Sequence, residues 1–223
     1  MKICAIIPVY NEERAIGSLI HLVKEKGLDI FVIDDGSTDR SAHIARDKGA
    51  TVLSHPHKMG KGASLRDGFH YALEHGYDGV ITMDGDGQHD TRDLDGFLAL
   101  AYEKKGDIIV GNRMTNTAKM PVVRLLTNKF MSLLISLACR QSIPDTQCGY
   151  RYIDAQALRA IELATSGFEI ETEMLMKAAK KNLKIISSPV RTIYENEESK
   201  INPFKDTIRF FRYFFRELWN SKK

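Results

Sequence analysis

The sequence predicts a single α/β domain built on a doubly wound, mostly parallel sheet. Short apolar runs alternate with amphipathic segments along the first half of the chain, which is the order of strand–helix–strand units. The first run, Ile3–Val9, is continuously apolar, as in a strand buried on both faces. With 223 residues, of which 43% are hydrophobic and 27% charged, the chain is large enough for one such domain.

The elements of the first half are placed by their periodicity and their glycines. A helix follows the first strand, with an apolar stripe over residues 16–23, Asn11 as its expected cap and Gly27 at its end. Further strands are predicted at residues 29–33, 51–53, 79–83 and 108–110. Further helices are predicted at residues 41–48, 61–75 and 92–105. In such sheets, ligands bind beyond the carboxyl ends of the strands.

The second half is less regular. It predicts a helix at residues 122–137, a short strand at 149–153, a helix at 172–181 and an alternating edge strand at 184–194. No repeat or low-complexity linker divides the chain. We therefore expect one domain over residues 1–202, with 1–112 and 113–202 as its two subregions.

The composition excludes several classes of protein. The cysteines, Cys4, Cys139 and Cys148, are far apart and odd in number, which argues against a disulfide framework or a zinc site and fits a reducing cytosol. No secretory signal is expected, and no nucleic-acid partner. No apolar run is expected to span a membrane, because the longest candidate covers only residues 130–139.

The C-terminal residues differ in composition from the rest of the chain. Residues 200–223 hold seven Lys or Arg and two acidic residues. Apolar residues recur near one helical face: Phe204, Ile208, Phe211, Phe215, Leu218 and Trp219. Arginines lie among them at 209, 212 and 216. This pattern predicts an amphipathic helix over residues 203–223, of which 204–223 would lie at an acidic membrane surface. Packing on the domain, or on a second subunit in a homodimer, remains the alternative.

Acidic residues gather where the predicted strands end. The first strand ends in Pro8-Val9-Tyr10-Asn11-Glu12, the second in Asp34-Asp35-Gly36-Ser37-Thr38-Asp39, and the fourth in Asp84-Gly85-Asp86-Gly87-Gln88. Asp34 and Asp39 could simply cap turns and helices. Asp84 and Asp86 flank a glycine after an apolar strand, and oxygen ligands of this kind suit Mg²⁺ or Mn²⁺. Such a cation would neutralise a diphosphate leaving group.

A lysine between two glycines begins the third predicted helix. Gly60-Lys61-Gly62 could merely start that helix, or Lys61 could meet diphosphate oxygens there. The segment is not a Walker A loop, because Gly62 stands where Ser or Thr is required. No Gly-rich loop follows the first strand, which argues against a dinucleotide-binding fold and a nucleotidyltransferase.

These motifs, in this order and spacing, resemble family-2 glycosyltransferases of the GT-A fold, and most of all dolichyl-phosphate mannose synthases and related polyprenyl-phosphate sugar transferases. The resemblance covers about residues 1–200. It implies a nucleoside pocket formed by Pro8, Tyr10, Glu12, Ile33 and Asp35. It also implies that Asp84 and Gly85 touch a GDP- or UDP-sugar, and that Asp86 and Gln88, beside Asp84, hold the metal.

The second half resembles the polyprenyl-phosphate branch. Asp145-Thr146-Gln147-Cys148-Gly149-Tyr150-Arg151 looks like its acceptor loop, and the Gln-x-x-Arg-Trp motif of processive synthases is missing. The resemblance implies an acceptor phosphate held by Arg113, Arg124 and Lys200. It also implies inversion by a single displacement, with Asp86, Arg113 and Asp145 as catalytic candidates. A sugar hydroxyl is the alternative acceptor, for which Asp145 would be the base. We expect a cytoplasmic protein, peripheral at the cytoplasmic membrane face.

Overall fold

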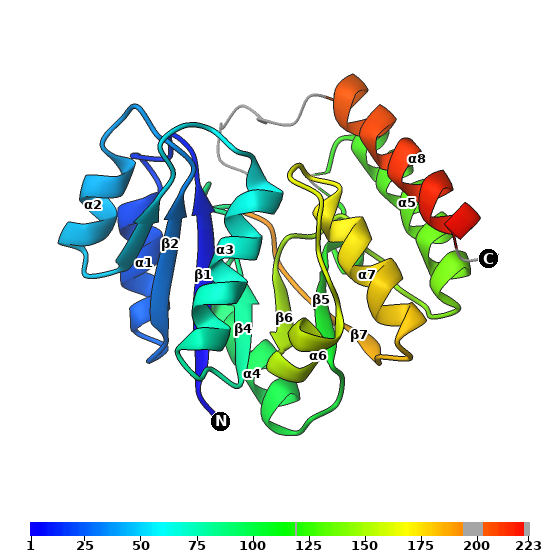
Figure 1. Cartoon of the computed structure of the whole chain (residues 1–223), viewed down its shortest axis with the longest axis horizontal. Coiled ribbons are helices and arrows are strands. Elements are labelled where there is room, and N and C mark those ends of the chain that lie inside the picture. The colour runs from blue at the N-terminus through cyan, green and yellow to red at the C-terminus, as the bar shows by residue number, and fades with distance from the viewer. Residues whose placement is uncertain (119, 194–202, 221–223) are drawn as a thin grey trace.

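The computed structural model describes residues 1–118, 120–193 and 203–220, and it contains the predicted α/β domain (Figure 1). Seven strands form one mixed sheet in the order β3-β2-β1-β4-β6-β5-β7. β6 is antiparallel to β4 and β5, and the other neighbours are parallel. The strands are β1 (Ile3–Val9), β2 (Asp29–Asp34), β3 (Thr51–Ser54), β4 (Gly79–Thr82), β5 (Ile108–Asn112), β6 (Arg151–Asp154) and β7 (Ile185–Pro189).

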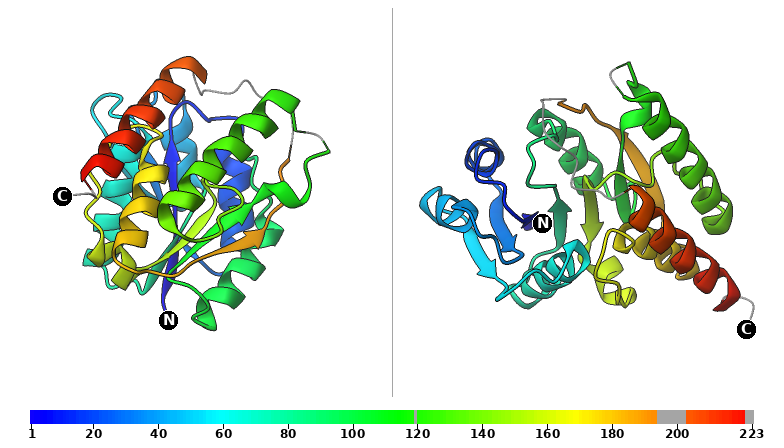
Figure 2. Two further views of the ribbon diagram at one scale, coloured as in Figure 1. Left: turned by 90° about the vertical axis from the view of Figure 1, so that its right-hand side faces the viewer. Right: turned by 90° about the horizontal axis from the view of Figure 1, so that it is seen from above.

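Helices cover both faces of this sheet. α1 and α4 lie on one face, and α3, α6 and α7 lie on the other (Figure 2). The helices are α1 (Ile16–Lys24), α2 (Ser41–Asp47), α3 (Lys61–Glu74), α4 (Leu94–Tyr102), α5 (Val122–Cys139), α6 (Ala155–Ala160), α7 (Ile170–Lys180) and α8 (Pro203–Asn220). Two 3-10 turns, η1 (Thr91–Asp93) and η2 (Arg113–Thr115), precede α4 and α5. The core lies between these layers, and β1 contributes a fully buried run to it.

Two local expectations were wrong. Asn11 does not cap α1, because that helix begins only at Ile16; Asn11 instead takes a positive φ of 55° and accepts a hydrogen bond from the Thr38 amide at 2.8 Å. Helix α6 was not predicted, because its six residues are too few to show a periodic pattern. The edge strand β7 is present but stops at Pro189.

Helix α5 also differs from the expectation. It runs for 18 residues, and 28% of the helix is buried inside the protein. By length and composition alone, this helix is long and apolar enough to cross a membrane. The expectation that no segment reaches this length was wrong. The apolar run of residues 130–139 is preceded by the polar residues Thr127 to Lys129. The helix does not end at these residues, and it begins at Val122.

Helix α8 packs on the domain with one face. Phe210, Tyr213 and Phe214 are buried, and α8 contacts α7. The Lys180 ammonium lies 2.5 Å from the Glu217 carboxylate and joins the two helices. One face of α8 is therefore docked on the domain, while Ile208, Phe215 and Trp219 stay exposed on its other face.

Candidate functional site

The turn after β4 lies against the end of β1. A Cβ atom on Gly85 would come within 3.1 Å of the Pro8 carbonyl oxygen and 3.0 Å of a Val9 methyl group. A larger residue would therefore force the two turns apart. The first and fourth strand ends, which the sequence placed at one edge of the sheet, are in contact there.

Lys61 joins three elements at this edge. As the first residue of α3, it places its Nζ 2.5 Å from Asp84 Oδ1 and 2.6 Å from Oε1 of Glu171, in the first turn of α7. Burial alone would lower the pKa of Lys61, but the two carboxylates outweigh burial and raise it. Burial would raise the pKa of Asp84, but the Lys61 charge outweighs it and holds that pKa well below its ordinary value.

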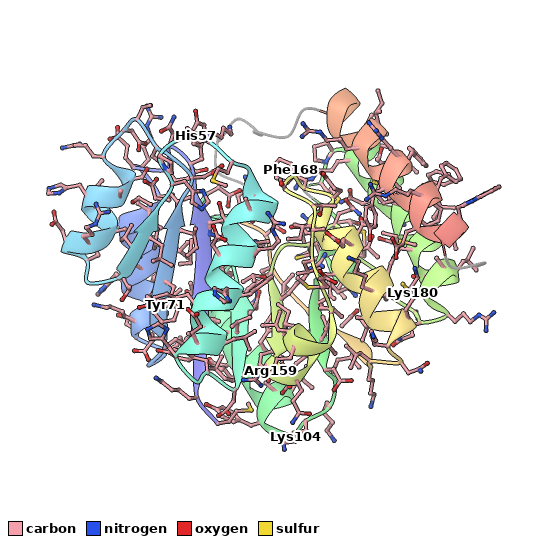
Figure 3. All side chains as sticks on the ribbon, in the orientation of Figure 1. His57, Tyr71, Lys104, Arg159, Phe168 and Lys180 are labelled. Carbon is pink, nitrogen blue, oxygen red and sulfur yellow. The ribbon has the colours of Figure 1, made fainter. Side chains whose placement is uncertain are left out.

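The glycines around Lys61 are required by close packing. The Gly62 amide donates to the Ser166 carbonyl at 2.8 Å, and a Cβ on Gly62 would lie 2.5 Å from the Thr165 carbonyl oxygen. Gly60 has a φ of 101°, which disfavours other residues. Gly60-Lys61-Gly62 thus starts a helix and also places Lys61 against Asp84, while a contact of Lys61 with diphosphate oxygens stays a prediction. Phe168, labelled in Figure 3, lies near this lysine, with its ring centroid 5.6 Å from Lys61 Nζ.

Asp84 and Asp86 fit a site for one divalent cation. Asp86 accepts the Gln88 amide at 3.0 Å, and its pKa is raised by burial and then by the charge of Asp84. This excess of negative charge is what a cation would relieve. Within the described part of the chain, no three His, Cys, Asp or Glu side chains are grouped to hold a metal. A cation here would therefore take two carboxylates and complete its shell with phosphate oxygens and water, as Mg²⁺ commonly does.

Gly149 brings the loop before β6 onto the same carboxylate. A Cβ at this position would lie 2.8 Å from Asp84 Oδ2 and 2.9 Å from Lys61 Nζ. Thr82, the last residue of β4, donates to the Gly149 carbonyl at 2.7 Å. The antiparallel pairing of β4 with β6 therefore places the segment of residues 145–151, expected to serve the acceptor, directly beside the expected donor side.

Asp35 is buried and hydrogen-bonded on both oxygens. It accepts the Met59 amide at 2.7 Å and the Gly60 amide at 2.8 Å, and its Oδ1 lies 2.9 Å from His55 Nδ1. The other ring nitrogen of His55 lies 2.9 Å from Asp67. Asp35 therefore supports the loop that carries Lys61.

The remaining residues expected around the nucleoside are near one another but differ in exposure. Lys58 lies over the Tyr10 ring at 3.6 Å, and the Glu12 amide donates to Ser41 at 2.7 Å. Ile33 is fully buried within β2. Asp34 accepts the Ser37 amide and Asp39 accepts the Ser41 amide, so these two acids stabilise turns.

Arg113 and Asp145 form a buried bidentate pair. Arg113 Nε and NH2 lie 2.7 and 2.9 Å from the two Asp145 oxygens, and the Arg113 amide donates to the same carboxylate at 3.1 Å. Arg113 occupies both oxygens of Asp145, which favours an orienting position for Asp145 over that of a base. Arg124 is half-buried in the first turn of α5. Lys200 lies outside the described residues.

Arg151 fixes the loop between this pair and the acidic turn. Its fully buried guanidinium donates to the carbonyls of Thr146, Cys148 and Glu171, each at 2.8 Å. Burial raises the pKa of the Cys148 thiol to about 12, so this cysteine is an inert core residue.

Sequence reasoning did not assign site contacts to His55, His89 and Glu171. His89 Nε2 lies 3.4 Å from Asp84 Oδ2, and Glu171 bonds Lys61 across 110 residues of sequence. The sequence signal for His89 is its position directly after Gln88, the last residue of the acidic motif that begins at Asp84. Glu171 and Glu173 lie in the first turn of α7, where acidic side chains suit the helix N-terminus.

Comparisons with known proteins agree with this geometry. The family described as glycosyl transferase family 2 matches residues 4–161. An undecaprenyl-phosphate mannosyltransferase of Micrococcus luteus is 31% identical over 219 residues, which cover 91% of this chain and 88% of the relative. A UDP-N-acetylglucosamine–dolichyl-phosphate N-acetylglucosaminyltransferase of Methanococcus voltae is 27% identical over 212 residues, covering 85% and 84%.

The fold is also found in a solved enzyme structure. Glucosyl-3-phosphoglycerate synthase of Mycobacterium tuberculosis, in complex with Mn²⁺, UDP and glucosyl-3-phosphoglycerate, superposes with a TM-score of 0.75. The match covers 98% of this chain and 79% of that chain, at 18% sequence identity. At that identity the likeness is one of fold.

Proposed function

The chain belongs to glycosyl transferase family 2 and is a glycosyltransferase of the GT-A fold, and we propose that it transfers a sugar from a nucleoside-diphosphate sugar to a polyprenyl phosphate. The observation that carries the proposal is the contact of Lys61, Asp84 and Gly149 at the carboxyl edge of the sheet. It joins the acidic turn, which suits a diphosphate and its cation, to the loop that resembles an acceptor loop.

On the donor side, residues 1–112 would hold the nucleotide. Pro8 and Glu12 lie beside the acidic turn, Lys58 lies over the Tyr10 ring, and Asp35 fixes the loop that carries Lys61. Lys61 is the nearest cation to Asp84, and we propose that it turns to the diphosphate oxygens when the donor binds. The UDP bound to the structural relative makes a UDP- or GDP-sugar the donor class to test first.

A divalent cation, Mg²⁺ or Mn²⁺, is proposed at Asp84 and Asp86, with Gln88 beside them. When bound, it supplies charge neutralisation for the leaving diphosphate. Support comes from the half-buried carboxylates of Asp84 and Asp86 and from the Mn²⁺ in the structural relative.

On the acceptor side, residues 113–202 would position the attacking phosphate. A phosphate monoester is mostly dianionic at neutral pH, so it can attack the anomeric carbon without a base, with inversion. Two anions repel at close range, and fixed arginines offset that repulsion. Asp145 locks the plane of Arg113, and we propose Arg113, with Arg124 and Lys200, as the cations that receive the phosphate.

The alternative acceptor is a sugar hydroxyl of a glycan or glycolipid. That reaction needs a proton acceptor, and the pairing of Asp145 with Arg113 disfavours the first candidate for it. The names of the relatives, a mannosyltransferase and an N-acetylglucosaminyltransferase acting on polyprenyl or dolichyl phosphate, also favour phosphate.

The donor half is tested with Asp86→Ala. We expect release of nucleoside diphosphate from the sugar donor to need Mg²⁺ or Mn²⁺, to stop in EDTA, and to return when the metal is restored. Asp86→Ala should lose it, whereas Asp90→Ala, which removes an acid four residues away that pairs with Arg92, should keep most of it. Full wild-type turnover in chelator would remove the metal from the proposal.

A further inference from the structure

The outer face of α5 is apolar along its length. Six side chains on this helix are each between 54% and 77% exposed: Val122, Val123, Leu126, Phe130, Leu133 and Leu137. From Val123 onward they recur alternately three and four residues apart, which places them on one helical face. Soluble monomers seldom expose a contiguous apolar patch of this kind without an interaction partner.

The inner face of α5 packs on the domain through both apolar and polar residues. Met131, Ile135 and Cys139 are buried there, and so are Asn128 and Ser132. Ser132 Oγ accepts the Thr146 amide at 2.9 Å, and Ser136 Oγ accepts the Ile143 amide at 3.0 Å. The helix is thus held on the domain through its inner face, and its outer face is exposed although it is apolar, unlike the outer face of an ordinary surface helix. These bonds hold α5 on the domain and tie it to the loop that contains Asp145.

The charges around the apolar face indicate its partner. No acidic residue lies on α5, while Lys129 and the capping residue Arg140 are exposed. On α8, the exposed charged side chains that the structure describes are also basic: Arg209, Arg212 and Arg216. A second copy of the chain on this surface would bring like charges together. An anionic lipid surface would pair with them and take up the apolar side chains.

The positions of the two helices agree with one flat partner. α5 and α8 lie on the same side of the molecule, away from β2 and β3, and both begin at the edge where β1 ends (Figures 1 and 2). The exposed side chains Ile208, Phe215 and Trp219 of α8 add apolar surface on that side. The same edge of the sheet carries the acidic turn and Lys61.

We propose that the outer face of α5 inserts into the interfacial layer of an anionic lipid membrane, with the helix lying along the membrane and α8 beside it. The contact is then made mainly by α5 rather than by the C-terminal helix. Through Ser132 and Ser136 it would hold the loop of residues 143–148 at the membrane surface. The placing of this loop at the membrane surface rests on the proposed function, because a polyprenyl phosphate is presented at that surface. The binding of vesicles does not depend on the proposed function.

The test is co-sedimentation of the full chain with vesicles of phosphatidylglycerol and phosphatidylcholine in equal parts, without substrate. The triple variant Leu126→Ser/Phe130→Ser/Leu133→Ser should bind at least about a hundredfold more weakly, because three exposed apolar side chains no longer enter the lipid. The matched double variant Phe215→Ser/Trp219→Ser should lose less. Vesicles of phosphatidylcholine alone should bind the wild type more weakly.

Three outcomes would overturn the proposal. One is a triple variant that is folded by circular dichroism and binds vesicles like the wild type. Another is a wild type that ignores vesicles but is a dimer by light scattering, with the triple variant a monomer, which would assign this face to a second copy. If the triple variant does not fold, the variant Lys129→Glu/Arg140→Glu replaces it. The third outcome is then that this folded variant binds anionic vesicles like the wild type, which contradicts the pairing of basic residues with anionic lipid.

A separate assay distinguishes failure of this inference from failure of the proposed function. With a short-chain, water-soluble polyprenyl phosphate, the triple variant should transfer sugar as fast as the wild type. With the same acceptor embedded in vesicles it should be slower. If the wild type transfers to neither acceptor, the proposed function fails while the vesicle result still stands.

Discussion

At the scale of single residues, Asp35 is bonded to protein groups through both of its carboxylate oxygens, so it supports the structure in addition to its expected place in the nucleoside pocket. Its oxygens accept two backbone amides and contact His55. Asp35→Ala should therefore lower the free energy of unfolding by about 1–3 kcal/mol, because buried amides lose their acceptor. It should also weaken nucleoside-diphosphate binding, because the loop before Lys61 loosens.

Urea denaturation and calorimetry measure these two effects of Asp35→Ala. The control is Asp67→Ala, which removes only the more exposed partner of His55. A variant with wild-type stability and reduced nucleotide affinity would show that Asp35 contacts the nucleotide without supporting the loop.

His55 gives the protein a pH dependence of stability. Burial would lower the pKa of His55, but its hydrogen bonds to Asp35 and Asp67 outweigh burial and raise the pKa above the ordinary value of 6.5. A raised pKa in the folded state stabilises the protein below pH 6.5, and this contribution is lost as the pH rises through the raised value. We expect the stability difference between wild type and His55→Gln to shrink from pH 6 to pH 9. A difference independent of pH would contradict the assignment.

At the scale of elements, the junction of the acceptor-side loop with β6 depends on Gly149. In Gly149→Ala the new methyl group would lie under 3 Å from Asp84 Oδ2 and Lys61 Nζ, so this ion pair must shift. We expect transfer to fall at least about tenfold, as when a site is displaced by a fraction of an ångström, with the thermal midpoint little changed. Gly96→Ala, in α4, where the new methyl would meet only Ser188 Oγ at an ordinary contact distance of 3.5 Å, serves as the control for a glycine change outside the site. Unchanged transfer in Gly149→Ala would separate this loop from the site.

The elements also show how far the sequence could go. The strands and most helices were predictable because their periodicity and glycines are local signals, and the strand-end acids met because parallel strands end at one edge. The bond between Lys61 and Glu171 was not predictable, because it joins residues 110 positions apart. For α5, periodicity shows which residues share a face. It does not show that the apolar face with Phe130 and Leu133 stays exposed.

At the scale of the whole molecule, α8 is part of the folded domain and not only an appended segment. Three of its aromatic side chains are buried, and Glu217 pairs with Lys180. Removing residues 203–223 should therefore lower the free energy of unfolding by several kcal/mol, at about 1.5–3 kcal/mol per buried aromatic side chain. Thermal unfolding tests this, with Phe215→Ser/Trp219→Ser as a control that leaves the docked face intact. A truncated protein as stable as the full chain would make α8 an independent tether.

The central claim for the molecule is that the acceptor is a lipid phosphate. The most direct measurement is transfer of radiolabelled sugar from GDP- and UDP-sugars to polyprenyl phosphate, followed by mild acid hydrolysis of the lipid product. In a lipid-linked sugar phosphate, the anomeric carbon carries a phosphate, which is a good leaving group. Mild acid should therefore cleave this bond and release the labelled sugar into water. The Arg113→Ala/Arg124→Ala variant should form little product while keeping most of its nucleotide affinity. A product that resists mild acid, or transfer only to a sugar hydroxyl, would contradict the account.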